Sequence, residues 1–321
     1  MTRPPPTTVS IITPSYNQGT FIGETVESVL GQEGDFELDY IVVDGGSTDN
    51  SVAVIQHYES LIDERKWPVR CLGIRYRWIS EKDRGQTDAI VKGFGMAEGG
   101  ILSWLNSDDT LLPGALSSVV ERFQELPSTA IVYGKVRYID GEGRAFGEVD
   151  AGPTDHEELA VLNRICQPGA FFRRSEYEAA GGLDLSLHYV MDHDLWIRMT
   201  LRTEPDFLPE FLASYRLHGE SKTAASWHAV AFQRETVGIL LRNYGRAPLN
   251  RVYAYCNARV RSLLPERSRG AGLLAIPFSL FWTLWEYLRL NRGVNAEDLR
   301  MIRPGNLRKI LRGGTAPPAG R

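Results

Sequence analysis

The 321-residue sequence has little cysteine and lacks the glycine-rich motifs that often hold nucleotide phosphates. No Gly-x-Gly-x-x-Gly follows the first apolar segment and no P-loop motif occurs, which disfavours dinucleotide binding and P-loop hydrolysis. The three cysteines are odd in number and have no metal-binding spacing: Cys71, Cys166 and Cys256. We therefore expect reduced thiols in a cytoplasmic protein. The first ten residues contain no apolar h-region, so no signal peptide is expected.

A membrane-spanning segment is also missing from the sequence, because a spanning helix needs about 20 apolar residues. The longest candidate, Ala271–Trp285, is interrupted by Pro277. Arginines lie on both sides of it, at Arg267, Arg269, Arg289 and Arg292. Basic flanks around a tryptophan-containing apolar segment are typical of a helix in the membrane interface. Residues 267–292 therefore have two alternatives: peripheral contact with the inner leaflet of a membrane, or packing on their own domain.

Negative charge is scarce in the tail and abundant elsewhere. Residues 261–321 contain 11 Lys and Arg against 4 Asp and Glu, a net of +7 within a total of −4, so residues 1–260 carry −11. An acidic body disfavours nucleic acid as a partner. The basic tail suits an anionic surface, although a tail that is simply solvated fits the same composition.

Short β-branched segments alternate with helical patterns in the first half of the chain. Strands are expected at 9–13, 40–43, 75–79 and 101–105, with helices at 21–30, 51–58, 87–97 and 113–125. Further strands are expected at 130–138, 167–173 and 207–217, the last broken by Pro209. This alternation predicts an α/β fold with a mostly parallel central sheet flanked by helices. Beyond residue 225 the pattern is helical, which predicts a catalytic domain at 1–224 and a helical extension at 225–321.

Each of the first four expected strands ends in a short segment that contains polar residues. The residues of these segments that we expect at the site are Thr13, Pro14 and Tyr16, then Asp44, then Asp83 and Arg84, and finally Asn106, Asp108 and Asp109. Ligands of open parallel sheets bind outside the carboxyl ends of the strands. We therefore expect these side chains to gather on one rim and to contact a nucleotide.

Two adjacent carboxylates at a strand end are costly unless a positive charge sits on them. A divalent metal that bridges a diphosphate is the obvious candidate, with Asp109 as its ligand and Asp108 on the ribose hydroxyls. Asp44 is then expected to accept a hydrogen bond from the base, and Tyr16 to stack on it. The alternative is that the acidic pair caps a helix starting near Pro113.

Two further candidates lie later in the chain. His218 follows the last expected strand and is a second candidate metal ligand, although such a histidine is more often a packed or surface residue. A mixed Asp and His shell favours Mn²⁺ over Mg²⁺ without deciding between them. Asp192 and Asp194 lie at a predicted helix start, where one can cap the helix while the other deprotonates an acceptor hydroxyl.

Five segments resemble family 2 glycosyltransferases of the GT-A fold, in particular bacterial enzymes of O-antigen and capsule assembly. They are Val9–Asn17, Val43–Asp49, Glu81–Gly85, Leu105–Asp109 and Met191–Trp196. The resemblance covers about residues 8 to 222. It implies an inverting, metal-dependent transfer from a nucleotide sugar, expected to be a UDP-sugar, to a glycan or lipid-linked acceptor.

The resemblance also implies roles for single residues. Asp44 matches the base-binding aspartate, and Asp108 with Asp109 the ribose and metal pair. Asp83 and Arg84 lie beside the nucleotide, Asp192 matches the catalytic base, and His218 the late metal-binding histidine. Two departures occur: Met191 precedes Asp192 where the family often has Glu, and Asn106 replaces a common Asp. The first leaves Asp192 and Asp194 both open as the base.

Two other functions compete with this one. A sugar-phosphate nucleotidyltransferase also uses a parallel sheet and metal-bound aspartates, but it needs a glycine-rich, basic loop that Thr13–Gly19 does not provide. A non-catalytic nucleotide-sugar-binding protein could retain the fold without the chemistry. The identity of the sugar and of the acceptor is not encoded in these motifs, because variable loops build those pockets.

Overall fold

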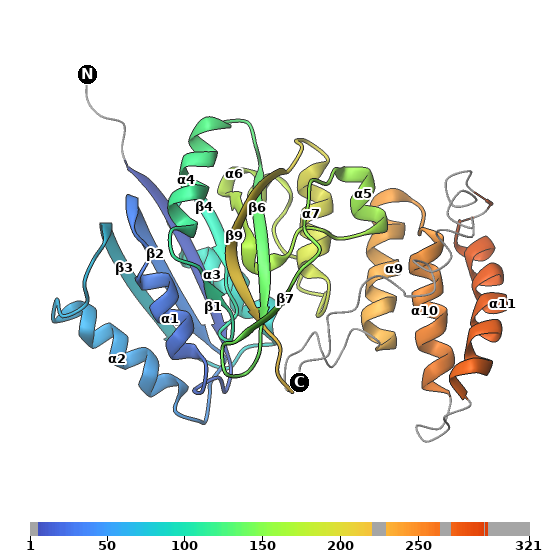
Figure 1. Ribbon diagram of the computed structural model, residues 1–321, viewed down its shortest axis with the longest axis horizontal. Coiled ribbons are helices and arrows are strands. Elements are labelled where there is room, and N and C mark those ends of the chain that lie inside the picture. Colours follow the sequence, from blue (N-terminus) through green and yellow to red (C-terminus); the bar gives the residue numbers. More distant parts are fainter. Residues whose placement is uncertain (1–5, 220–228, 264–270, 292, 295–321) are drawn as a thin grey trace. The chain divides into compact units, whose positions relative to one another are not determined.

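The computed structural model describes residues 6–219, 229–263, 271–291 and 293–294, with side chains omitted for 271–277. The chain forms two compact units (Figure 1). The first contains Met1–Asp155 and Arg164–Leu217, and the second contains His156–Asn163 and His218–Arg321. The predicted domain boundary at 224 falls outside the described residues.

A nine-stranded sheet forms the centre of the first unit. Its strands are β1 (Thr7–Ser15), β2 (Gly34–Asp44), β3 (Cys71–Ser80), β4 (Ile101–Trp104), β5 (Thr110–Leu111), β6 (Ile131–Ile139), β7 (Ala145–Glu148), β8 (Ala170–Arg173) and β9 (Asp206–Arg216). They are arranged in the order β3-β2-β1-β4-β8-β6-β9-β5, with β7 paired to β6. Strands β3, β2, β1 and β4 are parallel, as are β6 and β9, while β8, β5 and β7 add antiparallel pairs.

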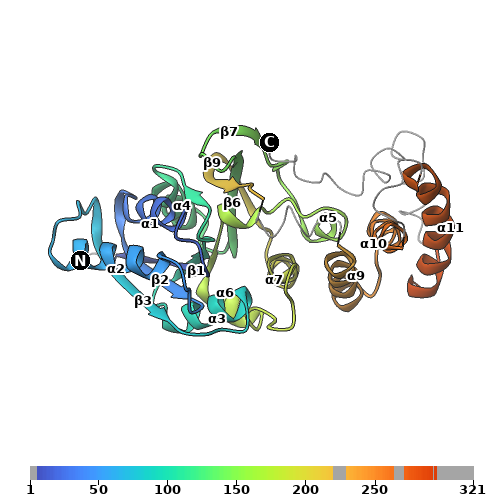
Figure 2. The same cartoon turned by 90° about the horizontal axis from the view of Figure 1, so that it is seen from below.

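The helices of the first unit lie on both faces of this sheet (Figure 2). They are α1 (Ile22–Leu30), α2 (Ser51–Asp63), α3 (Gln86–Met96), α4 (Ala115–Glu125), α6 (Arg174–Ala179) and α7 (Met191–Thr200), with a short 3₁₀ helix at Gln167–Gly169. Helices α1 and α4 cover one face, and α3 and α6 cover the other. Two-sided cover explains why the central strands are continuously apolar.

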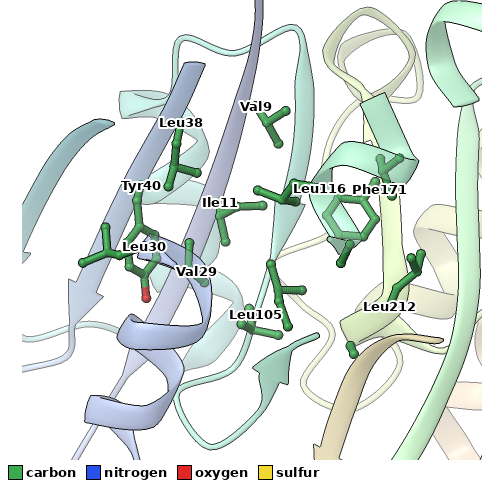
Figure 3. Packing of buried hydrophobic residues seen from close by; sticks show 14 of the residues in the cluster. Val9, Ile11, Val29, Leu30, Leu38, Tyr40, Leu105, Leu116, Phe171 and Leu212 are labelled. Carbon is green, nitrogen blue, oxygen red and sulfur yellow. The ribbon is translucent and has the colours of Figure 1, made fainter. Parts of the chain in front are cut away.

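One face of the sheet packs as a single apolar core (Figure 3). Ile11 of β1 lies between Val29 of α1 and Leu116 of α4, and all three side chains are at most 1% exposed. Burial of each such side chain contributes about 1.5–3 kcal/mol to folding. On the other face α3 approaches β1 closely, because a Cβ on Gly93 would come within 2.5 Å of Ile12. These contacts hold the carboxyl ends of the parallel strands in a fixed register.

Several expected element bounds differ from the structure. β2 and β3 begin at Gly34 and Cys71, earlier than their most apolar residues indicated. Pro209 does not break β9; the pairing with β6 jumps from Leu208 to Phe211 and leaves a bulge, which removes the need for a proline N–H. The expected strand at 167–173 begins with the 3₁₀ turn and is extended only from Ala170.

The second unit is helical. It contains α5 (His156–Val161), α9 (Val230–Tyr244), α10 (Leu249–Ser262) and α11 (Ala271–Asn291). The Tyr244 hydroxyl donates to the carbonyl of His156, and Asn250 Nδ2 donates to that of Val161 over 3.1 Å. The segment α5, which interrupts the first unit in sequence, is thus held by α9 and α10. Among the described helices, none is long and apolar enough to cross a membrane.

Candidate functional site

The carboxyl ends of β1, β2 and β3 meet in register at one edge of the sheet. Ser15 pairs with Asp44, and Asp44 pairs with Ser80. The loops that follow β1 and β2 are then joined by hydrogen bonds. Asn17 N–H donates to Ser47 Oγ over 2.7 Å, and Thr48 N–H donates to Asn17 Oδ1 over 2.8 Å. The predicted convergence of the first two polar segments is therefore present, and Asn17 and Ser47 are residues of the rim that sequence reasoning did not single out.

Asp44 is fully buried beneath these loops. Its carboxylate accepts from the N–H groups of Gly46 (3.1 Å) and Ser47 (2.9 Å) and from Ser80 Oγ (2.7 Å). Asp44 therefore fixes the turn after β2. Its expected contact with a base has to coexist with these donors and with the Ser47 hydroxyl, which also donates to it.

The residues expected to follow β1 differ sharply in exposure. Thr13 is fully buried and its hydroxyl shares a 3.0 Å hydrogen bond with the Tyr40 hydroxyl, while Pro14 is also buried within the strand. Tyr16 is 60% exposed. The geometry thus leaves the Tyr16 ring accessible for stacking, whereas Thr13 and Pro14 serve the packing of β1.

The segment after β3 lies against the loop after β2. A Cβ on Gly45 would come within 2.6 Å of Asp83 Oδ2, and Asp83 Oδ1 accepts from Gly85 N–H over 2.8 Å. Arg84 points outward, with 76% of its side chain exposed, and pairs with Asp88 over 2.8 Å. Asp83 is therefore part of the rim next to Asp44, and Arg84 lies at its exposed border.

The two acidic residues after β4 have different environments. Asp109 is fully buried; Oδ1 accepts from Arg216 N–H over 2.9 Å, and Oδ2 accepts from Asn106 Nδ2 over 3.2 Å. Burial and the neighbouring charge of Asp108 raise the pKa of Asp109 well above its ordinary value. Asp108 is only half-buried. Neither residue caps α4, which begins at Ala115 after Gly114, so the helix-capping alternative is wrong.

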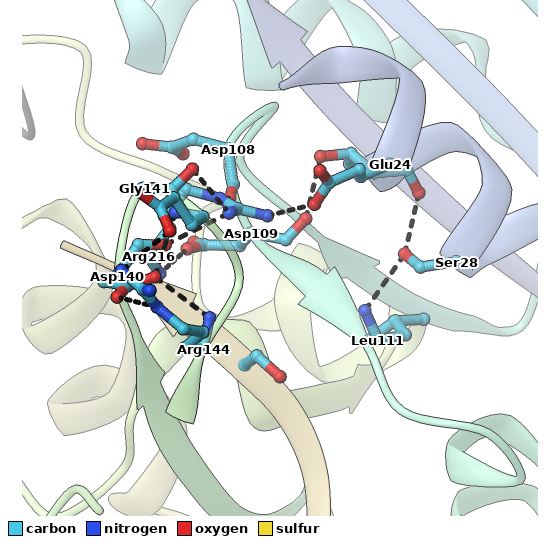
Figure 4. Close-up of polar contacts among 12 residues, drawn as sticks. Glu24, Ser28, Asp108, Asp109, Leu111, Asp140, Gly141, Arg144 and Arg216 are labelled. Carbon is cyan, nitrogen blue, oxygen red and sulfur yellow. Dashed lines mark hydrogen bonds and ion pairs between the residues drawn. The ribbon is translucent and has the colours of Figure 1, made fainter. Parts of the chain in front are cut away.

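Arg216 at the end of β9 contacts this acidic loop through both its main chain and its side chain (Figure 4). It is a fully buried arginine whose Nε donates to the carbonyl of Asp108 over 2.8 Å and whose Nη1 donates to that of Asp140 over 3.1 Å. Nη2 pairs with Glu24 of α1. A buried cation next to two carboxylates offsets part of the cost of their proximity. The sequence carried a signal for it, because Arg216 interrupts an otherwise apolar strand end.

The Asn106 side chain is hydrogen-bonded to two other side-chain amides, those of Gln86 and Gln167. Gln86, the first residue of α3, donates through Nε2 to Asn106 Oδ1 over 2.6 Å. Asn106 Nδ2 in turn donates to Gln167 Oε1 over 3.4 Å, in addition to its bond with Asp109. An aspartate at position 106 could accept from Gln86 but could not donate to Asp109. The departure from the family pattern at this position therefore has a structural role.

Helix α7 is fixed to β4 by stacked tryptophans. The rings of Trp104 and Trp196 are 5.7 Å apart and 19° from parallel, and both are buried. The start of α7 therefore lies in a defined place relative to the acidic loop that follows β4. The Thr87 hydroxyl also donates to the carbonyl of Leu187 over 2.9 Å, which ties the segment before α7 to the start of α3.

Asp192 and Asp194 at the start of α7 have separate roles. Val190 occupies the N-cap position, so neither aspartate is the N-cap residue, and both lie in the first turn of the helix. Asp194 is fully buried and pairs with Arg198 over 2.9 Å. Asp192 is half-buried. Asp194 therefore stabilises α7, and Asp192 is the carboxylate with access to solvent.

Cys166 directly precedes the 3₁₀ turn Gln167–Gly169. Burial raises the pKa of its thiol, and the negative charges of Asp109 and then Asp192 raise it further. Both carboxylates are therefore close enough to act on one sulfur atom. The chain after Cys166 contacts the acidic loop, because Gln167 Oε1 accepts from Asn106 Nδ2.

His218 follows Arg216 by two positions and is half-buried. Because Arg216 N–H is bonded to Asp109, the chain leaves β9 beside the acidic loop. Among the described residues, no three His, Cys, Asp or Glu side chains form a metal cluster by themselves. The carboxylates of the acidic loop fit a hard divalent cation that takes one or two protein ligands and completes its shell with substrate phosphates.

The chain resembles known proteins in sequence. The chain is 28% identical to chondroitin synthase of Escherichia coli over 214 residues, which cover 66% of this chain and 29% of that protein. It is 27% identical over 247 residues to an uncharacterized glycosyltransferase of Nostoc, covering 73% of each. A PGL/p-HBAD biosynthesis glycosyltransferase of Mycobacterium bovis is 30% identical over 191 residues, covering 59% of this chain and 68% of that protein. This chain therefore spans less than a third of the chondroitin synthase that it matches.

Solved structures share the fold. S. aureus TarS 1-349 in complex with UDP-GlcNAc has a TM-score of 0.63 at 15% identity, covering 95% of this chain and 87% of that one. The mannosyltransferase PcManGT from Pyrobaculum calidifontis, in complex with GDP-Man and Mn²⁺, has a TM-score of 0.56 at 17% identity, covering 88% and 85%. The predicted GT-A-like class, with helices after the sheet, is confirmed. The family model of Glycosyl transferase family 2 matches residues 10–178, more than half of the chain, so the protein belongs to that family and is a glycosyltransferase.

Proposed function

We propose that this protein transfers a sugar from a nucleoside-diphosphate sugar to a hydroxyl acceptor, with inversion at the anomeric carbon and with the help of a divalent metal. The observation that supports this most is the stacking of Trp104 on Trp196, which holds helix α7, with Asp192 in its first turn, against the strand that leads into the acidic loop. A leaving diphosphate and an acceptor hydroxyl need a cation and a base within one small region. The paired strand ends of β1 and β2 supply the adjoining nucleotide rim.

For the metal, we favour Asp108 over Asp109 as the main protein ligand. Both carboxylate oxygens of Asp109 already accept hydrogen bonds inside the protein, and its side chain is fully buried. Asp108 is half-buried, and its main chain is held by Arg216. When bound, the metal would neutralise charge on the leaving diphosphate. His218 remains a proposed second ligand, with Mn²⁺ and Mg²⁺ both open.

For the base, we favour Asp192 over Asp194. The negative charge of Asp194 is paired with Arg198 inside the protein, whereas Asp192 is only half-buried. In this proposal Asp192 takes the proton of the acceptor hydroxyl. The acceptor oxygen then bonds to the anomeric carbon while the bond from that carbon to the diphosphate oxygen breaks, so the configuration inverts.

For the nucleotide, we propose that the exposed Tyr16 ring stacks on the base, with Asp44 and Asp83 alongside. A uridine nucleotide is the first choice, which is consistent with UDP-GlcNAc in S. aureus TarS, whereas PcManGT holds GDP-Man. A glycan or lipid-linked acceptor of cell-surface polysaccharide synthesis, such as O-antigen or capsule, is consistent with the likeness to chondroitin synthase.

A donor screen tests this proposal. Purified protein is incubated with UDP-, GDP- and dTDP-sugars, each with Mn²⁺ or Mg²⁺, and release of the nucleoside diphosphate is measured. We expect release from one nucleotide class, stopped by EDTA and restored by metal. Release of pyrophosphate from a nucleoside triphosphate and a sugar phosphate would point to nucleotidyl transfer instead. Failure of every nucleoside diphosphate to bind in calorimetry with either metal would refute the proposal.

A further inference from the structure

Helix α11 buries polar side chains and exposes large apolar ones, which is the reverse of an ordinary surface helix. From Phe278 onward, its polar residues Ser279, Thr283 and Glu286 are at most 3% exposed. Its large apolar residues face outward instead: Phe278 (58% exposed), Leu280 (43%), Phe281 (75%), Leu284 (59%), Trp285 (58%) and Leu288 (44%). We call these six residues the apolar face of α11. Single exposed apolar residues are ordinary, but a contiguous patch of this kind marks an interaction site.

The orientation of α11 is set by contacts with the preceding helices. Ser279 Oγ donates to Asn257 Oδ1 of α10 over 3.4 Å. At the other end, Asn291 exchanges two hydrogen bonds with the main chain of Ala247, of 2.7 and 3.1 Å. Tyr287, between these points, is 3% exposed. Rolling the helix to hide the apolar face would break these bonds, so the exposure belongs to the folded unit.

The apolar face runs along one side of the helix. Phe278, Phe281, Trp285 and Leu288 are spaced by three or four residues, which places them on one side over about 15 Å of helix length. Such a stripe suits a helix lying flat on a surface. It does not suit a spanning helix, whose whole circumference is apolar.

Positive charge accompanies this face. The Arg289 guanidinium lies 5.8 Å from the Trp285 ring, with 55% of its side chain exposed, and it also pairs with the buried Glu286. The Arg259 guanidinium lies 4.7 Å from the Trp282 ring. The sequence from 261 to 321 carries +7 against −11 in the rest of the chain. A second copy docked on this face would bring two basic segments together, which is unfavourable. An anionic lipid surface satisfies both the apolar residues and the arginines.

We propose that the apolar face of α11 inserts into the headgroup region of an anionic lipid bilayer, with the helix parallel to the membrane plane. This inference goes beyond sugar transfer and does not depend on the donor. Both alternatives for the tail then hold together: α11 packs on its own unit through its polar side and contacts the membrane through its apolar face. Residues 267–270 and 292 of the expected contact segment lie outside the described part of the chain.

Flotation of the full-length protein with vesicles tests this proposal. Vesicles of phosphatidylglycerol with phosphatidylethanolamine are compared with vesicles of phosphatidylcholine, at low and high salt. The variant Phe281→Ser/Trp285→Ser removes the centre of the apolar face. The matched control is Val69→Ser/Leu72→Ser, which removes two apolar side chains of comparable exposure (52% and 53%) from the first unit.

We expect the wild type and the control to float with the anionic vesicles, and the α11 variant to bind them at least about tenfold more weakly. Equal flotation of all three proteins would overturn the proposal, as would equal binding to phosphatidylcholine. A dimer in sedimentation velocity that the α11 variant abolishes would show that a second copy occupies the face. Donor hydrolysis without vesicles is measured in parallel, so a protein that floats but lacks transferase activity refutes only the proposed function.

Discussion

The main-chain N–H of Arg216 donates to Asp109 Oδ1 over 2.9 Å, between residues 107 positions apart in sequence. This bond fastens the end of β9 to the acidic loop after β4. The side chain of the same arginine reaches under the loop to the carbonyl of Asp108. Arg216 therefore fixes the main chain that carries the half-buried Asp108 carboxylate, and it need not contact the substrate to do so.

Replacing Arg216 by lysine tests that function. Lysine keeps the charge but cannot reach the two carbonyls and Glu24 in the planar arrangement of a guanidinium. We expect metal-dependent nucleotide binding to weaken by about tenfold, equivalent to roughly 1.4 kcal/mol, measured by calorimetry of UDP with Mn²⁺. The control is Arg144→Lys, because Arg144 pairs with Asp140 in the same cluster but is 70% exposed. Equal dissociation constants in both variants would contradict the prediction.

Alanine substitution should separate the two acidic residues after β4. Asp109→Ala leaves Arg216 N–H without its acceptor and removes one of the two acceptors of Asn106 Nδ2, and it should cost about 1–3 kcal/mol of unfolding free energy. Asp108→Ala should lower stability less than Asp109→Ala does, because Asp108 is only half-buried, yet it should abolish metal-dependent binding. Chemical denaturation and calorimetry provide the two measurements. Full metal-dependent binding in the Asp108 variant would return the metal role to Asp109.

The two aspartates of α7 should separate in the same way. Asp192→Asn is expected to retain nucleotide binding and to lose about 10²–10⁴-fold in kcat, because amides do not accept the acceptor proton. Asp194→Asn removes the partner of the largely buried Arg198 and should lower the melting temperature first. Steady-state kinetics and thermal unfolding are measured on both variants. A near wild-type kcat for Asp192→Asn would sink its assignment as the base.

The link between the first two loops should depend on pH through Asp49. Burial acts to raise the pKa of Asp49, but hydrogen bonds from Ser51 and from Gly19 N–H (2.9 Å) outweigh it, so the pKa is lowered. A lowered folded-state pKa stabilises the protein above the unfolded value of about 3.9, and this contribution is lost as the pH falls below that value. The stability difference between wild type and Asp49→Ala should therefore be present at pH 6 and shrink below about pH 4. A difference that stays constant down to pH 3 would contradict this.

The rim was predictable from sequence because strand ends of a parallel sheet share one edge, whatever the details of packing. Asp44, Asp83 and Asp108 are therefore found where the pattern placed them. The depth of each side chain was not predictable, since depth depends on partners far away in the chain. Thr13 looked like a ligand residue and pairs with Tyr40 in the core instead.

Long-range partners account for the other differences. Asp109 is buried because Arg216 and Asn106 accommodate it, and neither contact is visible in a local pattern. The two-residue strand β5 forms only through its pairing with β9. The outward face of α11 could not be inferred from composition, because the same residues would serve equally well as a buried stripe.

The short helix α5 has a consequence for how the chain can be cut. Residues 156–163 come from the middle of the first unit's sequence, yet His156 and Val161 are bonded to Tyr244 and Asn250. A fragment ending at residue 217 would therefore keep these eight residues but lack the helices to which they are hydrogen-bonded. The two units are interleaved in the covalent chain. Expression of the first unit by itself therefore requires replacement of residues 156–163 as well as removal of the residues after 217.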